Sequence, residues 1–404
     1  MNTNAPTEVG VGLISVGWMG KVHSRAYDAI PVVYPELGIV PKLVIAADTE
    51  PSRAEYAKDV LGFAESTLDY HEVLAHPDVD VVSICAPNFL HAEIGIAAAK
   101  AGKAFWIEKP VGRGAVETRA VEAAANEAGV VTSIGFNYRH APAIEKAKAL
   151  IAEGALGRIT NIRGTFFADY SSEPNGALSW RFKRDLAGSG VLGDLMGHLV
   201  DLMHYIAGPI SDVSALTSTI HTQRPIQQMG KGTHFDVIEG GEMGDVENED
   251  YAALLVRFAG DAVAANAVGT LEASRVAVGP RASYNIEIYG TEGSLKWDFE
   301  RMNEFEVAIG RSGDLLGYQR VMAGPHFGDF AHFQPGAGTG MGFDDLKVVE
   351  ARKFLESFVG ARHVNSNIHD AVAAAQVVDA AERSAANGEW IHLEPVAGVT
   401  AATR

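Results

Sequence analysis

Short apolar runs alternate with helical patterns over the first third of the chain. The apolar runs predict buried strands at residues 11–16, 43–47, 79–85, 104–107 and 130–135. Helical patterns lie between them, the clearest at residues 18–30 and 89–101. Strands that alternate with helices predict a parallel sheet covered by helices on both faces, which is a doubly wound α/β domain.

The second half of the chain follows a different pattern. Strands are predicted in succession at residues 159–166, 251–258, 262–269, 283–289 and 294–299, with helices at residues 142–153, 343–358 and 368–386. Strands without helices between them predict a large, mostly antiparallel open sheet in an α+β domain. We therefore expect two domains, at residues 1–138 and 139–404.

The turn after the first strand has the pattern of a dinucleotide-binding Rossmann unit. A strand ends near Gly17, and Gly17, Trp18 and Met19 stand where a helix begins. A helix N-terminus offers unpaired N–H groups to a pyrophosphate, and Gly20 lets the helix pack close to the strand. Ser15 replaces the first glycine of Gly-x-Gly-x-x-Gly, so the pattern alone leaves an ordinary βα turn as an equal alternative.

An acidic residue follows the second predicted strand. A carboxylate at this place accepts both ribose hydroxyls of a dinucleotide and repels a 2′-phosphate. Asp48 fills the place, so NAD is favoured over NADP as the cofactor. Asp48 also fits an N-cap for the helix that starts near Glu50. Arg53 lies close enough in sequence to reach a 2′-phosphate, which is the argument for NADP.

Five residues fall at the carboxyl ends of the predicted parallel strands. They are Gly17, Asp48, Pro87, Lys109 and Asn137. Ligands of such sheets bind at this edge, so we expect these residues to line one site. Pro110 holds the backbone of Lys109 extended, and the bond between these two residues is a candidate for a cis peptide.

Three motifs resemble the Gfo/Idh/MocA oxidoreductase family: CAPNFLHAE at residues 85–93, AGK at 101–103 and EKP at 108–110. The likeness extends over nearly the whole chain. It implies that Lys109 is the catalytic lysine beside the nicotinamide and the reacting hydroxyl. It implies cofactor contacts from Ala86, Pro87, Asn88, His91, Glu108, Lys109, Asn137 and Arg181. The family's open sheet supplies subunit contacts, so the resemblance also implies a homo-oligomer, either a dimer or a tetramer.

One predicted helix in the second half carries an apolar stripe and a polar face. Asp194, His198, Asp201 and Tyr205 share the polar face at helical spacing. Periodicity alone favours a solvated face, and the spacing of the first three also fits a metal site. The resemblance points instead to the family's Asp-x-x-x-His motif, with His198 as general acid/base and Asp194 orienting the substrate or the imidazole. Lys109 then supplies the electrostatic role, and no metal is expected.

The likeness also bears on the substrate. Trp180-Arg181 and residues 301–305 most resemble family members that act on levoglucosan or inositol. This implies a substrate site built from Lys109, Tyr138, Trp180, Arg181, Asp194 and His198, with Asp169 and Tyr170 lining the sugar pocket. We expect an NAD-dependent dehydrogenase that oxidises a secondary hydroxyl of a pyranose or cyclic polyol to a ketone. The alternatives are an NADPH-dependent reductase of a sugar ketone, an NAD-using glycosidase of the same fold, and a non-catalytic dinucleotide sensor.

Composition narrows the choice of partners. The 404 residues include 33 Lys+Arg against 51 Asp+Glu, and the net charge of −18 argues against nucleic acid or an anionic membrane as a partner. Cys85 is the single cysteine, which excludes an internal disulfide. No apolar run reaches the length of a membrane span, and the N-terminus lacks a signal pattern. We therefore expect a cytoplasmic protein with a small carbohydrate or polyol as its substrate.

Three further segments have weaker signals. The acidic run at residues 239–250 is expected to be a solvated loop. The Gly- and Phe-rich segment that contains His326, His332 and Gln334 is expected to lie over the substrate cleft, either of its own chain or of a neighbouring subunit. Residues from 396 onward are expected to form a loose tail.

Overall fold

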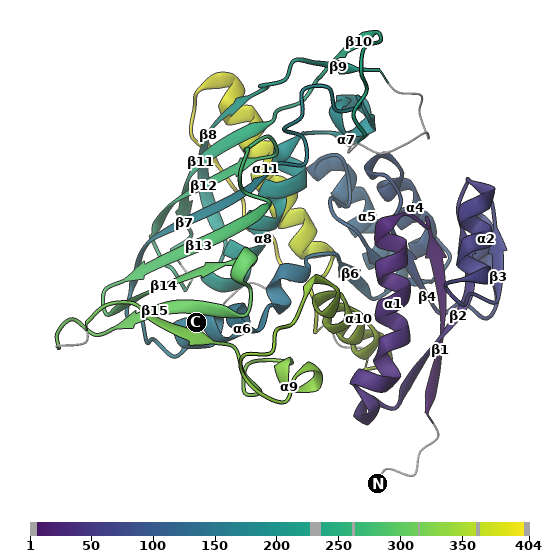
Figure 1. Cartoon of the computed structure of the whole chain (residues 1–404), viewed down its shortest axis with the longest axis horizontal. Helices are drawn as coiled ribbons and strands as arrows, with labels where there is room; N and C mark the ends of the chain where they lie inside the picture. Colours follow the sequence, from purple (N-terminus) through teal and green to yellow (C-terminus); the bar gives the residue numbers. More distant parts are fainter. Residues whose placement is uncertain (1–5, 227–235, 261–262, 314–315, 361–363, 400–404) are drawn as a thin grey trace.

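The computed structural model describes residues 6–226, 236–260, 263–313, 316–360 and 364–399. Two large sheets organise these residues, one from the first part of the chain and one from the second (Figure 1). Helices fill the space between them, so each sheet has one face toward the middle of the molecule (Figure 1). The two-part architecture predicted from the sequence is confirmed, and the boundary between residues 138 and 139 stays our prediction.

The first sheet has six parallel strands in the order β3-β2-β1-β4-β5-β6. The strands are β1 (Thr7–Ile14), β2 (Ile39–Ala47), β3 (Glu65–Thr67), β4 (Val81–Ile84), β5 (Ala104–Ile107) and β6 (Thr132–Ile134). Its helices are α1 (Trp18–Val33), α2 (Pro51–Asp59), α3 (Tyr70–Ala75), α4 (Asn88–Lys100) and α5 (Ala115–Ala128). This is the predicted doubly wound Rossmann domain. Its first strand ends at Ile14, before the predicted end, because Ser15 turns the chain with a φ of 75°.

The second sheet has nine strands in the order β16-β15-β14-β13-β7-β12-β11-β8-β17. They are β7 (Ile159–Ala168), β8 (Ile210–Ser218), β11 (Tyr251–Phe258), β12 (Val268–Ser274), β13 (Ala282–Gly290), β14 (Gly293–Asp298), β15 (Glu304–Ile309), β16 (Gln319–Met322) and β17 (Ile391–His392). Every pairing in it is antiparallel except that of β7 with β12. A separate short ribbon joins β9 (Gln223–Pro225) to β10 (Met243–Asp245).

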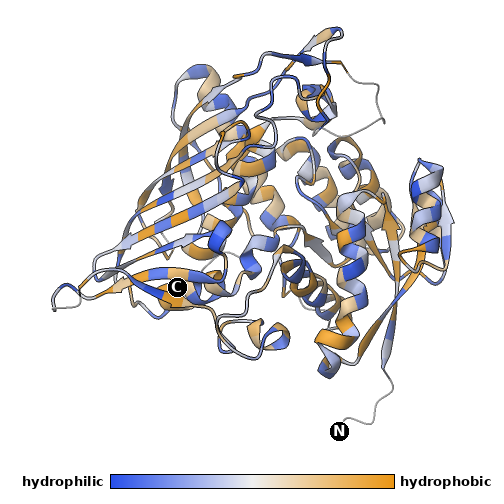
Figure 2. Cartoon of the chain, viewed as in Figure 1, coloured by the Kyte–Doolittle hydropathy of each residue, from blue (hydrophilic) through white to orange (hydrophobic). Residues whose placement is uncertain are grey.

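Alternation of side chains explains how the second sheet is covered. Along β11, Ala252, Leu254, Val256 and Phe258 are buried, whereas Leu255 between them is exposed. Figure 2 shows the same alternation of hydrophobic and hydrophilic positions along neighbouring strands. Such a period of two is typical of a sheet with one covered face. The cover consists of α6 (Pro142–Ala152), α8 (Gly197–Ala207) and α11 (Ile368–Asn387) (Figure 1).

One helix from the last part of the chain packs on the first domain and not on the second sheet. The helix α10 (Phe343–Gly360) lies beside α1, as Figure 1 shows. Its Val348 and Phe354 are buried in one cluster with Tyr27 of α1 and Trp106 of β5. The second half of the chain therefore completes the core of the first domain as well as its own.

One predicted strand differs from the structure. The strand expected at residues 262–269 begins only at Val268, and residue 262 lies outside the described residues. Residues 263–266 form a turn instead, because Ala264 donates its N–H to the carbonyl of Ala207 at the end of α8 and Asn266 takes a φ of 60°. An alanine-rich run lacks the bulky alternating residues that hold a strand in register.

The acidic run was wrongly predicted to be a solvated loop over its whole length. Asn248, Glu249 and Asp250 are all buried, at 1 %, 5 % and 0 % exposure. Asp250 pairs with the buried guanidinium of Arg275 at 2.8 Å, so its charge is compensated inside the protein. Residues 239–245 are exposed or half-buried, as expected.

The segment expected over the substrate cleft packs, within one chain, against α1 and α10, and its place over the cleft of a neighbouring subunit stays a prediction. It contains the short helix α9 (Phe330–Phe333), and the ring of His332 lies 4.5 Å from that of Tyr34 at the end of α1. Asp329 before this helix pairs with Arg352 of α10 at 2.9 Å. At the C-terminus, Gly398 accepts a hydrogen bond from Asn367, so the tail is attached as far as this residue. No helix among the described residues is long and apolar enough to cross a membrane.

A buried charge cluster joins three elements at the domain junction. Arg139 is 2 % exposed and donates from Nε to Asp201 of α8 at 2.7 Å. Its Nη2 lies 3.2 Å from Asp370, which caps the N-terminus of α11. Two carboxylates and one guanidinium are thus held together in the interior, where removing one partner of a pair is costly.

We predict that Arg139→Met destabilises the protein strongly. Asp201 and Asp370 would stay buried without their cation, and breaking a buried pair costs about 3–5 kcal/mol. Thermal and urea unfolding would measure the loss. Arg311→Met is the matched control, because this exposed arginine bonds Glu292 and Thr291 at the surface, and its loss should cost about 0.5 kcal/mol or less. Equal stability of the two variants would contradict the prediction.

Candidate active site

The carboxyl edge of the first sheet carries the residues that the sequence placed there. β1, β2, β4, β5 and β6 are parallel, and the chain leaves each of them at the same edge. The residues that follow these ends are Gly17, Asp48, Pro87, Lys109 and Asn137. The predicted convergence at one edge is therefore confirmed.

The turn between β1 and α1 is tight and leaves the helix N-terminus open. Ser15 adopts a φ of 75°, a region that favours glycine, so it performs the turn that the missing motif glycine would make. A Cβ on Gly20 would lie 2.2 Å from the carbonyl oxygen of Ser15, which is why the helix needs glycine here. A Cβ on Gly17 would meet only Ser15 Oγ at 4.0 Å, and no side chain caps α1.

Asp48 is fixed by two backbone groups. Its Oδ2 accepts from the N–H of Val16 at 2.8 Å, and its Oδ1 accepts from the N–H of Glu50 at 2.9 Å. The N-cap of α2 is Glu50, so the suggestion that Asp48 caps this helix is wrong. Each carboxylate oxygen keeps a second lone pair for a ligand hydroxyl. Arg53 is exposed in the first turn of α2.

These features fit a dinucleotide. The uncapped N-terminus of α1 suits a pyrophosphate, and Asp48 suits a ribose. At the end of β6, the buried amide nitrogen of Asn137 has no hydrogen-bond partner among the described residues, so it has a donor to spare. Trp18 is 68 % exposed at the start of α1 and stacks on Phe343 of α10 at 5.7 Å, so it forms a wall beside the turn.

Lys109 forms an ion pair across the two domains. It follows β5, and its bond to Pro110 is cis, as the sequence suggested. Its Nζ donates to Asp194 Oδ1 at 2.9 Å and to the main-chain oxygen of Asp194 at 3.0 Å. The ammonium is therefore held at one place, with one of its three N–H groups left for a ligand.

Asp194 is kept ionised by its neighbours. Its Oδ2 accepts from the hydroxyl of Tyr170 at 2.5 Å. Burial would raise the pKa of Asp194, but the charges of Lys109 and Arg181 and the hydrogen bonds from Tyr170 and Lys109 outweigh burial and hold this pKa well below its usual range. The sequence interpretation had Asp194 orient the substrate or the imidazole, whereas in this structure its carboxylate orients the ammonium of Lys109.

Aromatic rings surround the imidazole of His198. Its ring lies edge-on to Tyr138 at 4.8 Å and to Phe136 at 5.9 Å, with Phe166 at 6.2 Å. Burial lowers the pKa of His198 well below its usual value, and the positive charge of Lys109 lowers it further. The imidazole is therefore neutral near pH 7 and can accept a proton.

The segment that carries Asp194 is a single π-helical turn, η4 (Leu192–Met196), that leads into α8. Its start is held by the buried carboxylate of Glu249, whose Oε1 accepts from the N–H groups of Gly190 and Leu192 at 2.7 and 3.0 Å. Such wide turns are frequent at functional sites. The sequence analysis missed Glu249 because it lies in the acidic run, far from the motif.

The predicted polar face of this helix is not solvated. His198 and Asp201 are 7 % and 3 % exposed, and α8 is buried nearly all round. The metal alternative also fails on geometry, because Asp201 bonds Arg139 while Asp194 bonds Lys109 and Tyr170. No group of three metal-ligating side chains occurs in the part of the chain that the structure describes.

A second buried network lies behind Lys109. Glu108 Oε1 accepts from Lys347 Nζ of α10 at 2.6 Å and from His23 Nε2 of α1 at 3.0 Å. Lys347 also pairs with Glu350 at 2.8 Å. Burial opposes ionisation of Glu108, but the charge of Lys347 and the contact with His23 keep its pKa below the usual range. Burial lowers the pKa of His23 to about 4, so this ring is neutral.

The sequence analysis named Glu108 as a cofactor contact but missed His23 and Lys347. The network anchors Glu108, the residue before Lys109, to two helices from opposite ends of the chain. The sequence offers one signal for this buried pair: Lys347 lies within the apolar pattern of α10, three residues before Glu350.

The other predicted cofactor and substrate residues surround this centre in different ways. His91 is 1 % exposed and donates from Nδ1 to the carbonyl of Pro110 at 2.7 Å, so it supports the loop of Lys109. Asn88 donates to the carbonyl of Ala187 at 3.3 Å and so bridges the domains. Ala86 is buried beside them at the end of β4. Met19 lies half-buried in the first turn of α1.

Three aromatic and basic residues complete the surround. Trp180 and Arg181 lie in the short helix η3 (Trp180–Phe182), with the guanidinium of Arg181 4.5 Å from the ring of Trp180. Trp180 also contacts the ring of Phe89 in α4 at 6.1 Å. Tyr138 is 9 % exposed and packs between the rings of His198 and Phe299, so it supports the imidazole.

Comparison with known proteins places this geometry in a family. A sequence profile described as "Oxidoreductase family, NAD-binding Rossmann fold" matches residues 9–136. A second, described as "GFO/IDH/MocA C-terminal domain", matches residues 144–296. The two matches cover the elements that carry both halves of the Lys109–Asp194 pair.

Three individual proteins are similar over nearly the whole chain. Levoglucosan dehydrogenase of Pseudarthrobacter phenanthrenivorans is 38 % identical over 391 residues, which cover 96 % of this chain and 99 % of that protein. Inositol 2-dehydrogenase of Rhizobium meliloti is 25 % identical, over 95 % of this chain and 99 % of the relative. A solved structure of levoglucosan dehydrogenase in complex with NADH and levoglucosan superposes with a TM-score of 0.88 at 37 % identity, covering 96 % of this chain and 99 % of that one.

Both profiles and the similarity to levoglucosan dehydrogenase extend over the two sheets and the centre between them. The chain belongs to the Gfo/Idh/MocA family of oxidoreductases with an NAD-binding Rossmann domain.

Proposed function

We propose that the protein is an NAD-dependent dehydrogenase that oxidises a secondary hydroxyl of a pyranose, such as levoglucosan, or of a cyclic polyol to a ketone. One observation carries the proposal: a fixed ammonium and a neutral buried imidazole occur together at the edge of the NAD-binding sheet. The names of the relatives, which act on levoglucosan and inositol, support the substrate class.

In the proposed mechanism the cofactor supplies hydride acceptance, and the protein manages the proton and the charge. His198 accepts the hydroxyl proton, because its lowered pKa keeps the ring neutral. Lys109 donates a hydrogen bond to the same oxygen and stabilises the developing alkoxide. Two cations, Lys109 and Arg181, act on the single carboxylate of Asp194. The site therefore keeps a net positive charge, which stabilises the substrate's alkoxide oxygen.

The two alternative enzyme activities inferred from the sequence remain candidates, and each would give different products. A glycosidase of this fold would release a cleaved glycoside without net NADH. A reductase would consume NADPH with a sugar ketone. Lys109 of the first domain and Asp194 and Tyr170 of the second are fixed to one another, an arrangement that a non-catalytic dinucleotide sensor would not require.

We also infer that the chain forms a homo-oligomer through the outer face of the second sheet. Leu216, Leu255 and Val268 are 57 %, 51 % and 52 % exposed on the face turned away from α8 and α11. Apolar side chains on an open sheet favour burial against a second copy. Light scattering of the purified protein would measure its mass, and a monomer would contradict this inference. The cytoplasmic location predicted from the sequence stays a prediction.

The first prediction concerns the reaction. With NAD, levoglucosan or an inositol isomer should yield NADH, seen as absorbance at 340 nm, together with a ketone two mass units lighter than the substrate. Mass spectrometry of the product is the decisive measurement. Cleavage of a glycoside without NADH would favour the glycosidase, and turnover only with NADPH and a sugar ketone would favour the reductase.

The second prediction concerns the catalytic pair. His198→Ala should lower kcat by at least roughly a hundredfold, the usual cost of losing a general base, and Lys109→Ala should cost about as much. NAD affinity of His198→Ala should stay nearly unchanged, because His198 lies on the second domain. The kcat of the wild type should fall on acidification only below pH 6.5, where His198 becomes protonated, and this fall should be absent in His198→Ala. A near-normal kcat of His198→Ala would contradict the assigned role.

The third prediction concerns cofactor choice. The wild-type protein should bind NAD more tightly than NADP by at least roughly tenfold, about 1.4 kcal/mol, because Asp48 repels a 2′-phosphate. Asp48→Asn should reduce this ratio, and Glu50→Gln, the exposed neighbour, should not. Fluorescence titration with both dinucleotides measures the ratio. Equal wild-type affinities would show that Arg53 decides the specificity instead.

A further inference from the structure

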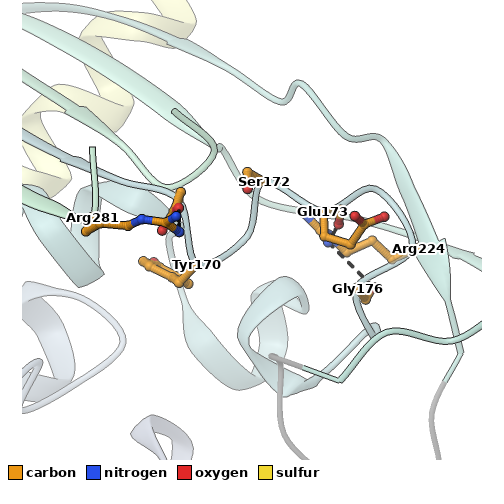
Figure 3. A pocket seen from close by; sticks show the side chains of 7 residues that line it. Tyr170, Ser172, Glu173, Gly176, Arg224 and Arg281 are labelled. Atoms are coloured by element: carbon orange, nitrogen blue, oxygen red, sulfur yellow. Dashed lines mark hydrogen bonds and ion pairs between the residues drawn. The ribbon is translucent and has the colours of Figure 1, made fainter. Parts of the chain in front are cut away.

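A large pocket lies beside Tyr170, the tyrosine whose hydroxyl bonds Asp194. It has a volume of about 540 Å³ and is lined by Asp169, Tyr170, Ser172, Glu173, Arg224 and Arg281. Figure 3 shows Tyr170 and Arg281 on one side of it and Glu173 and Arg224 on the other. Volumes of about 300–1,000 Å³ are typical of small-molecule sites. None of these residues other than Tyr170 touches the Lys109–Asp194 pair.

Tyr170 connects this pocket to the reacting centre. Its ring lines the pocket, while its hydroxyl donates to Asp194 Oδ2 at 2.5 Å. Asp194 in turn lies 2.9 Å from Lys109 Nζ. The side chains of Tyr170 and Asp194 thus lie between the pocket and the ammonium, so the two places are neighbours.

The pocket is held open by a buried arginine. Arg224 is 1 % exposed, and its Nη1 donates to the carbonyl of Glu173 at 2.8 Å, while its Nη2 donates to that of Ser171. Its guanidinium also stacks over Phe182 at 4.4 Å. These contacts hold the loop after β7 in one shape, so the pocket is built before a ligand arrives.

The chemistry of the lining fits a neutral polyhydroxyl compound. Two carboxylates, Asp169 and Glu173, can accept hydrogen bonds from hydroxyl groups, and two guanidinium groups, Arg224 and Arg281, balance their charge. Asp169 is already paired with Arg281, which leaves no excess charge to favour an anion. The ring of Tyr170 adds an apolar surface of the kind on which a sugar face packs.

We propose that this pocket is a subsite for a second sugar ring, so that the enzyme acts on disaccharides or glycosides in preference to single sugars. The inference rests on the proposed dehydrogenase function. The ring to be oxidised lies at Lys109 and His198, and its glycosidic substituent extends past Tyr170 into the pocket.

The test compares levoglucosan with its 4-O-α-glucosyl and 4-O-β-glucosyl derivatives. At least one derivative should show a kcat/KM at least roughly fivefold above that of levoglucosan, through a lower KM. Glu173→Gln and Arg281→Met should abolish this advantage and leave levoglucosan turnover within roughly twofold of the wild type. Arg311→Met is the matched control, because Arg311 is exposed and pairs with Glu292. It should change neither the advantage of the derivative nor the turnover of levoglucosan. Weaker turnover of both derivatives, or an equal effect of the variants on all three sugars, would overturn the subsite.

A binding measurement separates this inference from the proposed function. Saturation-transfer NMR of the two derivatives with the wild-type protein and with Glu173→Gln needs no turnover. Binding that depends on Glu173 without any oxidation would uphold the subsite and overturn the dehydrogenase. Oxidation of levoglucosan without binding that depends on Glu173 would support the dehydrogenase and overturn the subsite.

Discussion

The ion pair between Lys109 and Asp194 is the contact on which the candidate active site depends. It joins the end of a parallel strand in one domain to a wide helical turn in the other at 2.9 Å. Neither partner could hold this position alone, because each side chain has several rotatable bonds that would otherwise remain free. The pair therefore fixes both the place of the ammonium and the relative position of the two sheets.

Buried charges around the pair reinforce this geometry. Glu108, next to Lys109, is tied to Lys347, and Arg139 at the domain junction is tied to Asp201 and Asp370. Buried ion pairs add little net stability over apolar packing, because desolvation offsets their attraction. What they supply here is directionality, since a charge inside the protein is satisfied only where its particular partners are placed. Lys109 thus stands on a frame in which small displacements are costly.

The two halves of the chain contribute different parts of the chemistry. The first sheet supplies an open helix N-terminus, a fixed carboxylate at Asp48 and the lysine. The second sheet supplies the imidazole of His198, the carboxylate of Asp194 and the pocket beside Tyr170. Because the two sets of groups lie in different domains, changes of substrate can accumulate in the second domain without loss of the cofactor side in the first.

Local patterns in the sequence were sufficient for many of the elements and for the strand-end residues. Apolar runs and alternation depend on neighbours in the chain, so β1, β2, β4, β5 and β6 of the first sheet, β7, β11, β13 and β14 of the second sheet, and the strand-end positions of Asp48 and Lys109 followed from them. The strands β3, β8, β15, β16 and β17 were not predicted. The same patterns were wrong at residues 262–269 and for the buried end of the acidic run. Only the tertiary structure showed that Glu249 holds the turn of Asp194 and that Lys347 reaches Glu108 from 239 residues away. Electrostatic pairing acts through space between side chains that periodicity treats as surface, and so it is decided only when the chain has folded.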